Sequence, residues 1–171
     1  MRVWTIGHGT RPAPDLLTML RTAGVETLLD VRRYPGSRRN PQYNRGALEA
    51  ALAEAGIRYR HVEALGGRLS GEPGEERFAC IRVRAFRSYA ARMGSPDWQA
   101  ALASAVEEPA PCFMCAETPW TKCHRRFIAE LLTARGVEVL HLSPAGVERH
   151  RLMDVAEVRE GRLYLCGALV A

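Results

Sequence analysis

Short apolar runs and helical apolar stripes alternate along the chain, and turns rich in glycine and proline separate them. Patterns typical of β-strands cover residues 2–6, 25–31, 57–62, 112–116 and 137–142. Apolar positions that recur every three or four residues predict helices at residues 14–24, 44–56, 75–93, 95–108 and 123–132. Strands that alternate with helices in this way are typical of α/β proteins with a parallel sheet.

We therefore expect one α/β domain over residues 1–171, a three-layer sandwich with a mostly parallel, Rossmann-like sheet. Residues 155–165 have the pattern of two short strands that turn at Glu160-Gly161, which predicts a small edge hairpin at the C-terminus. No run of eighteen apolar residues is present, so we expect no transmembrane helix and no membrane partner. The first residues lack a signal-peptide pattern, which makes a cytoplasmic location the default expectation.

The charge of the chain allows a phosphate-bearing partner without requiring one. The formal net charge is +5, but all of the 24 basic residues except Lys122 are arginine, a composition that GC-rich codon usage also produces. No block of lysine and arginine resembles a nucleic-acid-binding tail. Five cysteines, an odd number in a chain of this length, do not indicate a disulfide framework.

The stretch richest in reactive side chains is residues 111–126, PCFMCAETPWTKCHRR. It predicts a buried strand that leads through a turn into a helix, and ligands of open α/β sheets bind at such strand ends. If Thr121 caps the helix, Lys122, Arg125 and Arg126 lie near its N-terminus, where cations are slightly unfavourable. A bound anion would reverse that sign, because backbone N–H groups and arginine would hold it together. The alternative is an arginine-rich helix start whose side chains point into solvent.

Two other strand ends carry polar side chains that would line the same pocket at the edge of the sheet. His8 lies between two glycines after the first strand, whereas Asp30 and Arg32 end the second strand, two residues apart and so on one face. The loop at residues 34–44 follows, and its Ser37 and arginines are suited to gripping a phosphate. Each feature has a structural alternative, namely a hydrogen-bonded turn histidine, a surface ion pair and a solvated loop.

Thiol chemistry is one hypothesis for the central stretch. Cys115 or Cys123 would be the nucleophile, with His8 or His124 as its base, because nearby cations and a helix N-terminus favour a thiolate. Cys123 also fits the buried stripe of the predicted helix, which is a purely structural role.

A carboxylate pair is the second hypothesis. Glu117 would act as acid, base or nucleophile together with Asp30. Cys115 and Glu117 are two residues apart, so they share a face if the strand extends that far. The sequence leaves the choice between these assignments open.

No metal site is expected, although Cys112, Cys115, Cys123 and His124 are of the types that bind zinc. Cys112 and Cys115 are three residues apart, so they would point to opposite faces of a strand. Adjacent helical residues also diverge, which argues against one ion shared by Cys123 and His124. No second Cys-x-x-Cys or histidine pair is present, and no cofactor is expected.

The order of these motifs resembles a family of bacterial and archaeal proteins called domain of unknown function 488. The resemblance covers nearly the whole chain through the segments Thr5–His8, Asp30–Arg32 with Pro35 and Ser37, Gly56–Tyr59, Leu65–Gly67, Cys115–Glu117 and Cys123–Arg125. It departs at Gly9, where the family usually has serine, so a side chain near the site is absent. The resemblance implies a compact α/β domain with a shared pocket, and it supplies no reaction.

The Asp30–Arg32 segment also resembles sulfurtransferase domains of the rhodanese type. Those domains carry a cysteine followed by a loop that closes on an arginine. Thr121 stands where that arginine would follow Cys115, so the active loop does not match.

We therefore expect a pocket at the carboxyl ends of strands, in a protein that binds or acts on a phosphate-bearing small molecule, a nucleotide or nucleic acid. The catalytic candidates are Cys115, Glu117, Asp30 and His8, and the substrate-binding candidates are Arg32, Ser37, Cys123, His124 and Arg125. An enzyme of this kind would be a hydrolase or transferase. The alternatives are a non-catalytic nucleic-acid or anion-binding module, and a thiol redox or sulfurtransferase-like protein that uses Cys115 and Cys123.

Overall fold

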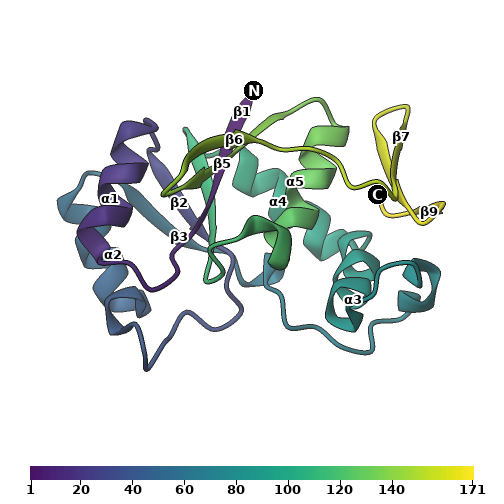
Figure 1. Ribbon diagram of the computed structural model, residues 1–171, viewed down its shortest axis with the longest axis horizontal. Coiled ribbons are helices and arrows are strands. Elements are labelled where there is room, and N and C mark those ends of the chain that lie inside the picture. Colours follow the sequence, from purple (N-terminus) through teal and green to yellow (C-terminus); the bar gives the residue numbers. More distant parts are fainter.

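A six-stranded sheet forms the centre of the computed structural model, which describes residues 1–171 (Figure 1). Its strands are β1 (Arg2–Gly7), β2 (Thr27–Asp30), β3 (Arg58–His61), β4 (Pro111–Cys115), β5 (Glu138–Ser143) and β6 (Gly146–Arg149). They lie in the order β3-β2-β4-β1-β5-β6, in which the first five are parallel and β6 is antiparallel at one edge. The predicted α/β fold with a mostly parallel sheet is confirmed.

Five α-helices accompany this sheet. They are α1 (Ala13–Thr22), α2 (Arg45–Glu54), α3 (Arg84–Met93), α4 (Pro96–Val106) and α5 (Arg125–Ala134). Short 3₁₀ helices cover Pro41–Tyr43, Glu63–Leu65, Glu75–Phe78 and Trp120–Lys122. The start of α4 follows its sequence signal, since the Ser95 hydroxyl accepts a hydrogen bond from the Trp98 amide and Pro96 takes the first helical position.

Helices pack on both faces of the sheet, as the alternating side chains of β4 show. Cys112 and Met114 belong to a core cluster with residues of α1 and α2, whereas Phe113 and Cys115 belong to a larger cluster with residues of α3, α4 and α5. Figure 1 shows α1 and α2 on one side of the sheet and α4 and α5 on the other. None of the helices has the length and apolar character needed to span a membrane.

Two predicted helices have different bounds in the structure. The helix predicted at residues 75–93 is a 3₁₀ turn, a non-helical segment and then α3. Helix α5 begins at Arg125 with His124 at its N-cap, and Thr121 lies in the preceding 3₁₀ turn rather than at the cap. The extended backbone of Cys123, with φ −127° and ψ 149°, separates the two helical turns.

The C-terminal hairpin forms, but in a separate sheet. The strands β7 (Ala156–Arg159) and β8 (Arg162–Leu165) pair antiparallel around the predicted turn, and β9 (Ala168–Leu169) adds a third strand. The expectation of a hairpin at the edge of the main sheet is therefore wrong, since β6 occupies that edge. Leu163 and Leu165 instead pack into the core cluster that contains α5, which holds the small sheet on the helical side.

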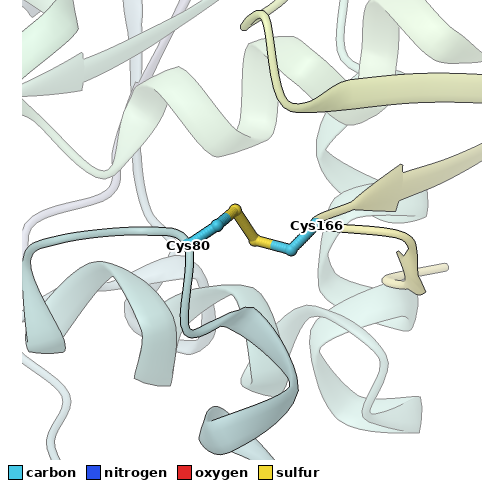
Figure 2. The surroundings of a disulfide bond; sticks show 2 residues. All are labelled: Cys80 and Cys166. Carbon is cyan, nitrogen blue, oxygen red and sulfur yellow. A yellow bond between two sulfur atoms is a disulfide. The ribbon is translucent and has the colours of Figure 1, made fainter.

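A disulfide ties this small sheet to the segment before α3 (Figure 2). It joins Cys80 and Cys166 with a Cα–Cα distance of 5.8 Å, which is inside the usual range. The odd number of cysteines did not indicate this bond, because the other three, Cys112, Cys115 and Cys123, are free and buried. A cross-link between residues 86 positions apart strongly restricts the unfolded chain.

Removal of this disulfide should lower the free energy of unfolding by about 2–5 kcal/mol, because the unfolded chain regains the entropy of the open loop. Urea denaturation of Cys80→Ser and of oxidised wild-type protein measures the difference. The variant should match wild type treated with reductant, and should itself show no response to reductant. Equal midpoints for the variant and the oxidised wild type would contradict a stabilising role for the bond.

Candidate functional site

A cavity of about 580 Å³ opens at the carboxyl ends of β1, β2 and β4. The chain leaves β2 toward β3 and leaves β4 toward β5, in opposite directions along the sheet, and such a reversal opens a crevice between the strand ends. The lining residues are His8, Gly9, Thr10, Arg32, Arg33, Tyr34, Gly36, Ser37, Asn40, Gly67, Arg68, Ala85, Phe86, Cys115, Ala116, Glu117, Thr118, Pro119, Lys122, Cys123 and His124.

Two thiols and one imidazole lie together in the wall of this cavity. The Nδ1 atom of His124 is 3.7 Å from the Sγ atom of Cys115 and 3.6 Å from that of Cys123. The other ring nitrogen, Nε2, is 2.9 Å from the backbone oxygen of Val31. Because a carbonyl oxygen only accepts hydrogen bonds, Nε2 carries the proton of the neutral ring, and the lone pair on Nδ1 faces both sulfur atoms.

Backbone geometry explains why these three groups meet. Cys123 is extended and His124 begins the helical turn, so the two side chains approach the same point although the residues are adjacent. Gly67 makes room for the imidazole, because a β-carbon on this residue would lie 2.6 Å from the Nδ1 atom of His124. The absence of a side chain at Gly67 therefore allows the His124 ring to occupy this position.

The two thiols differ in acidity. The hydrogen bond from the Cys123 thiol holds the pKa of the Cys115 thiol well below its ordinary value, against the opposing effect of burial. His124 adds to this lowering when both of its ring nitrogens are protonated, because the ring then donates to the sulfur and carries a positive charge. Burial raises the pKa of the Cys123 thiol well above its ordinary value, and the hydrogen bond to Cys115 adds to this effect. A thiolate is therefore favoured at Cys115 and a thiol at Cys123.

Asp30 does not reach the cavity. Its fully buried carboxylate accepts hydrogen bonds from the amide, Nε and Nη2 groups of Arg32 and from the hydroxyl of Tyr59, over distances of 2.6–3.1 Å. Asp30 does not line the cavity, and Arg32 and Tyr59 hydrogen-bond to its carboxylate oxygens, so the structure gives no support to its predicted catalytic role. Asp30 positions Arg32 instead.

His8 lies in the cavity wall as a hydrogen-bond acceptor for Arg32. Its Nδ1 atom is 2.7 Å from the carbonyl oxygen of Gly9, so Nε2 is unprotonated in the neutral ring and faces Nη1 of Arg32 at 3.3 Å. Burial lowers the pKa of His8, and its ring stacks on Tyr43 with centroids 4.3 Å apart. In this arrangement the ring orients Arg32, and its lone pair is not free to act as a base.

Arg125 also lies behind the cavity wall. Its buried guanidinium donates from Nη1 to the carbonyl oxygen of Glu117, and from Nη2 to that of Thr118 at 2.8 Å. Arg125 does not line the cavity, and the loop between β4 and α5 takes two of its five guanidinium N–H groups, so its role in this structure is to hold that loop. Gly7 allows the same loop to approach β1, since a β-carbon there would lie 1.9 Å from the Glu117 carbonyl oxygen.

Cations outnumber anions around the cavity. Arg32, Arg33, Arg68 and Lys122 line it, and Glu117 is the sole carboxylate among the lining residues. The side chain of Arg32 makes three hydrogen bonds, which leave two of its five guanidinium N–H groups without a protein partner. The cavity thus presents one fixed cation beside three others, an environment that favours an anionic ligand.

Seven of the nine predicted site residues line the cavity, namely His8, Arg32, Ser37, Cys115, Glu117, Cys123 and His124. Asp30 and Arg125 support it from behind. Sequence reasoning missed the contributions of Gly67-Arg68 and of the Val31 carbonyl. The glycine turn was a weak signal for the first, whereas a backbone carbonyl has no signature in the sequence.

Cys115, Cys123 and His124 are the residues that could hold a metal ion. Their two Sγ atoms and the Nδ1 atom all lie within 4.8 Å of one another. Cys112 faces the opposite core cluster, as strand alternation predicts. Cys123 and His124 do not diverge as predicted, because both precede α5, which begins only at Arg125.

Comparison with known families adds one finding to this geometry. The family described as Domain of unknown function DUF488 matches residues 13–132, more than half of the chain. The chain belongs to this family. The match begins after Thr5–His8 and includes the other motif segments of this DUF488 protein. No curated protein and no solved structure matches the chain.

A buried pair of histidines anchors the loop between β4 and α5 in this DUF488 protein. The ring of Trp120 stacks on that of His141, with centroids 4.3 Å apart and planes 8° from parallel. His141 pairs through Nδ1 with the Thr5 hydroxyl at 2.7 Å and through Nε2 with His150 at 2.9 Å. Burial, with the charges of His150 and Arg125, lowers the pKa of His141 to about 3.

Stability should therefore fall as the pH drops from about 6.5 to about 3, because the unfolded chain takes up a proton at His141 and the folded chain does not. The sign follows from a folded-state pKa that lies below the ordinary value of 6.5. This residue alone contributes a slope of about 1.4 kcal/mol per pH unit. Urea denaturation of wild type and His141→Gln at several pH values between about 4 and 7 should show a shallower loss in the variant. Parallel curves would contradict the assignment.

Proposed function

We propose that this DUF488 protein is an enzyme that acts on a phosphate-bearing small molecule of nucleotide size, bound in the cavity at the strand ends. One juxtaposition carries the proposal: a fixed arginine and three further cations surround two thiols and an imidazole that face the same cavity. A cluster with only a structural role has no need of an opening or of the surrounding positive charge.

Arg32 is the main phosphate anchor in this proposal. Its ion pair with Asp30, with Nη2 and Oδ2 2.6 Å apart, holds the guanidinium in one orientation before a ligand arrives. A guanidinium donates two parallel hydrogen bonds to a phosphate, and Arg33, Arg68 and Lys122 add positive charge. Four cations beside one carboxylate favour a phosphate ester, which carries more negative charge than a single carboxylate does.

The size and the aromatic lining of the cavity favour a nucleotide. Its volume of about 580 Å³ is within the range of small-ligand sites. Tyr34, which is 62% exposed, and Phe86 lie in the wall, and flat rings of this kind stack on nucleobases. A duplex would need a continuous basic surface instead, so a free nucleotide or the end of a nucleic-acid chain is the proposed substrate class.

Cys115 and Glu117 are the residues proposed to carry the bond-breaking step of a hydrolase or transferase. Both line the cavity, and the Glu117 carboxylate makes no hydrogen bond or ion pair within the protein. The other two catalytic candidates, Asp30 and His8, are engaged with Arg32. The reacting atoms of the substrate would therefore lie between the phosphate anchor and Cys115.

The proposal also treats residues 1–171 as one domain with a Rossmann-like, three-layer arrangement and a cytoplasmic location. The two core clusters, which contain different strand side chains, support the layered description. The Cys80–Cys166 disulfide is uncommon for a reducing compartment, so trapping its redox state in intact cells tests the location.

A thiol redox protein is the alternative that a specific observation favours. The Sγ atoms of Cys115 and Cys123 lie within 4.8 Å of each other, and both cysteines are free. Treatment with oxidised glutathione would then join them, as the disulfide reagent takes up the two electrons. Oxidised glutathione would inactivate the proposed enzyme, because the disulfide consumes its catalytic cysteine. A thiol redox protein would instead use oxidised glutathione as a substrate.

Calorimetry with a nucleoside monophosphate, the matching nucleoside and inorganic phosphate tests ligand binding. The monophosphate should bind, and the nucleoside should not. Arg33→Ala should weaken monophosphate binding about fivefold, which corresponds to about 1 kcal/mol for a partly exposed charge pair. Arg38→Ala is the matched control, because Arg38 belongs to the same loop but does not line the cavity, and it should leave binding unchanged.

Mass spectrometry of a panel of phosphate-bearing compounds, incubated with the protein, tests turnover. Cys115→Ser and Glu117→Gln should abolish product formation and retain monophosphate binding. If the wild-type protein binds a phosphate-bearing compound but forms no product, the protein is a non-catalytic anion-binding module and not an enzyme. If no phosphate-bearing compound binds, the proposal is overturned.

A further inference from the structure

We propose that Cys115, Cys123 and His124 bind one zinc ion, with the fourth coordination position open to the cavity. The two Sγ atoms and the Nδ1 atom lie within 4.8 Å of one another, so a single ion can reach all three. Thiolate sulfur and imidazole nitrogen are the ligand types that zinc prefers.

The two nitrogen–sulfur distances fit a tetrahedral ion. Zinc binds sulfur at about 2.3 Å and imidazole nitrogen at about 2.0–2.1 Å, so tetrahedral geometry sets the distance between the two ligand atoms at about 3.5 Å. The Nδ1 atom of His124 is 3.7 Å from Sγ of Cys115 and 3.6 Å from Sγ of Cys123. The two Sγ atoms lie within 4.8 Å of each other, whereas Zn–S bonds of about 2.3 Å in tetrahedral geometry place them about 3.8 Å apart, so the sulfur atoms would move toward each other by at most about 1 Å.

The surroundings of His124 are also those of a metal ligand. A metal-bound histidine usually donates its other ring N–H to a carbonyl or carboxylate, which fixes the ring and its tautomer. Here Nε2 lies 2.9 Å from the Val31 carbonyl oxygen, and the Nδ1 lone pair is directed at the two sulfur atoms. The backbone of Gly67 lies against the ring on the side where a β-carbon would clash with Nδ1.

The three ligands leave room for a fourth. All of them line the cavity, and no other histidine, cysteine or carboxylate joins the group. Structural zinc sites are closed by four protein ligands, whereas catalytic sites, including those with two cysteines and one histidine, keep one position for water or substrate. This arrangement therefore corresponds to a catalytic zinc centre.

The role of the ion in the reaction rests on the proposed function. A water molecule in the open position would provide the oxygen that bonds to the electrophilic atom of the phosphate-bearing substrate. Glu117 would accept the water proton, and the leaving group would depart with the electron pair of the broken bond and then take that proton. Cys115 would then act through the ion, and the reaction would be a hydrolysis.

Metal binding is tested on chelator-treated protein, handled anaerobically without reductant so that the Cys80–Cys166 bond stays intact. Zinc content by mass spectrometry should reach one ion per chain, and cobalt(II) should give the intense absorption of a tetrahedral site with thiolate ligands. Cys115→Ala and Cys123→Ala should each bind zinc more than about 100-fold more weakly, since losing even an outer partner costs 10–100-fold. Cys112→Ala is the matched control, a free buried cysteine on the opposite face of β4, and should bind like wild type.

A second measurement uses wild-type protein alone, in case a variant fails to fold. Zinc should protect Cys115 and Cys123 from alkylation by iodoacetamide, as read by peptide mass spectrometry. Equal alkylation with and without zinc, or equal zinc affinity in Cys115→Ala and wild type, would overturn the proposal. If oxidised glutathione, which takes up the two electrons, joins Cys115 to Cys123 equally fast with and without added zinc, the metal site is overturned in favour of the redox alternative. Zinc binding in a protein that binds no phosphate would uphold the metal site and overturn only the proposed function.

Discussion

The hydrogen bond between Nε2 of His124 and the Val31 carbonyl oxygen is the constraint on which the site depends. It connects the end of β2 to the start of α5, two segments far apart in the sequence. It also decides the protonation of the ring, because the carbonyl accepts only from a protonated nitrogen. The two sulfur atoms consequently face a lone pair. With the opposite tautomer, they would face an N–H group and the carbonyl would lose its donor.

The loop between β4 and α5 is held in place by contacts that lie outside the cavity. Gly7 lets its backbone touch β1, the buried Arg125 holds two of its carbonyls, and Trp120 stacks on His141. Gly7, Arg125 and His141 are buried, and Trp120 is partly buried. Glu117 and Lys122 are exposed and line the cavity, so a ligand meets these side chains on a backbone that several contacts hold.

The main helices and strands were predictable from the sequence, because the spacing of apolar residues shows which side chains each element buries. The approximate location of the cavity was predictable as well, since the carboxyl ends of parallel strands meet at one edge. The Cys80–Cys166 bond and the separate C-terminal sheet were not, because pairing across 86 residues leaves no periodic trace. The convergence of Cys123 and His124 depends on one extended residue before α5, a backbone angle that the pattern does not specify.

Asp30 and Arg125 show what a charge in the sequence leaves undetermined. Asp30 and Arg125 stand at strand and helix ends, as ligand-binding residues do, but their partners are Arg32 and backbone carbonyls. Pairing with Asp30 neutralises most of the charge of Arg32 and fixes its donors. The electrostatic attraction for an anion then comes mainly from Arg33, Arg68 and Lys122, which have no salt-bridge partner. Arg32 contributes hydrogen-bond donors in a fixed orientation. A buried ion pair of this kind contributes little net stability, but it holds a guanidinium in its binding orientation before the ligand arrives, which lowers the entropic cost of positioning.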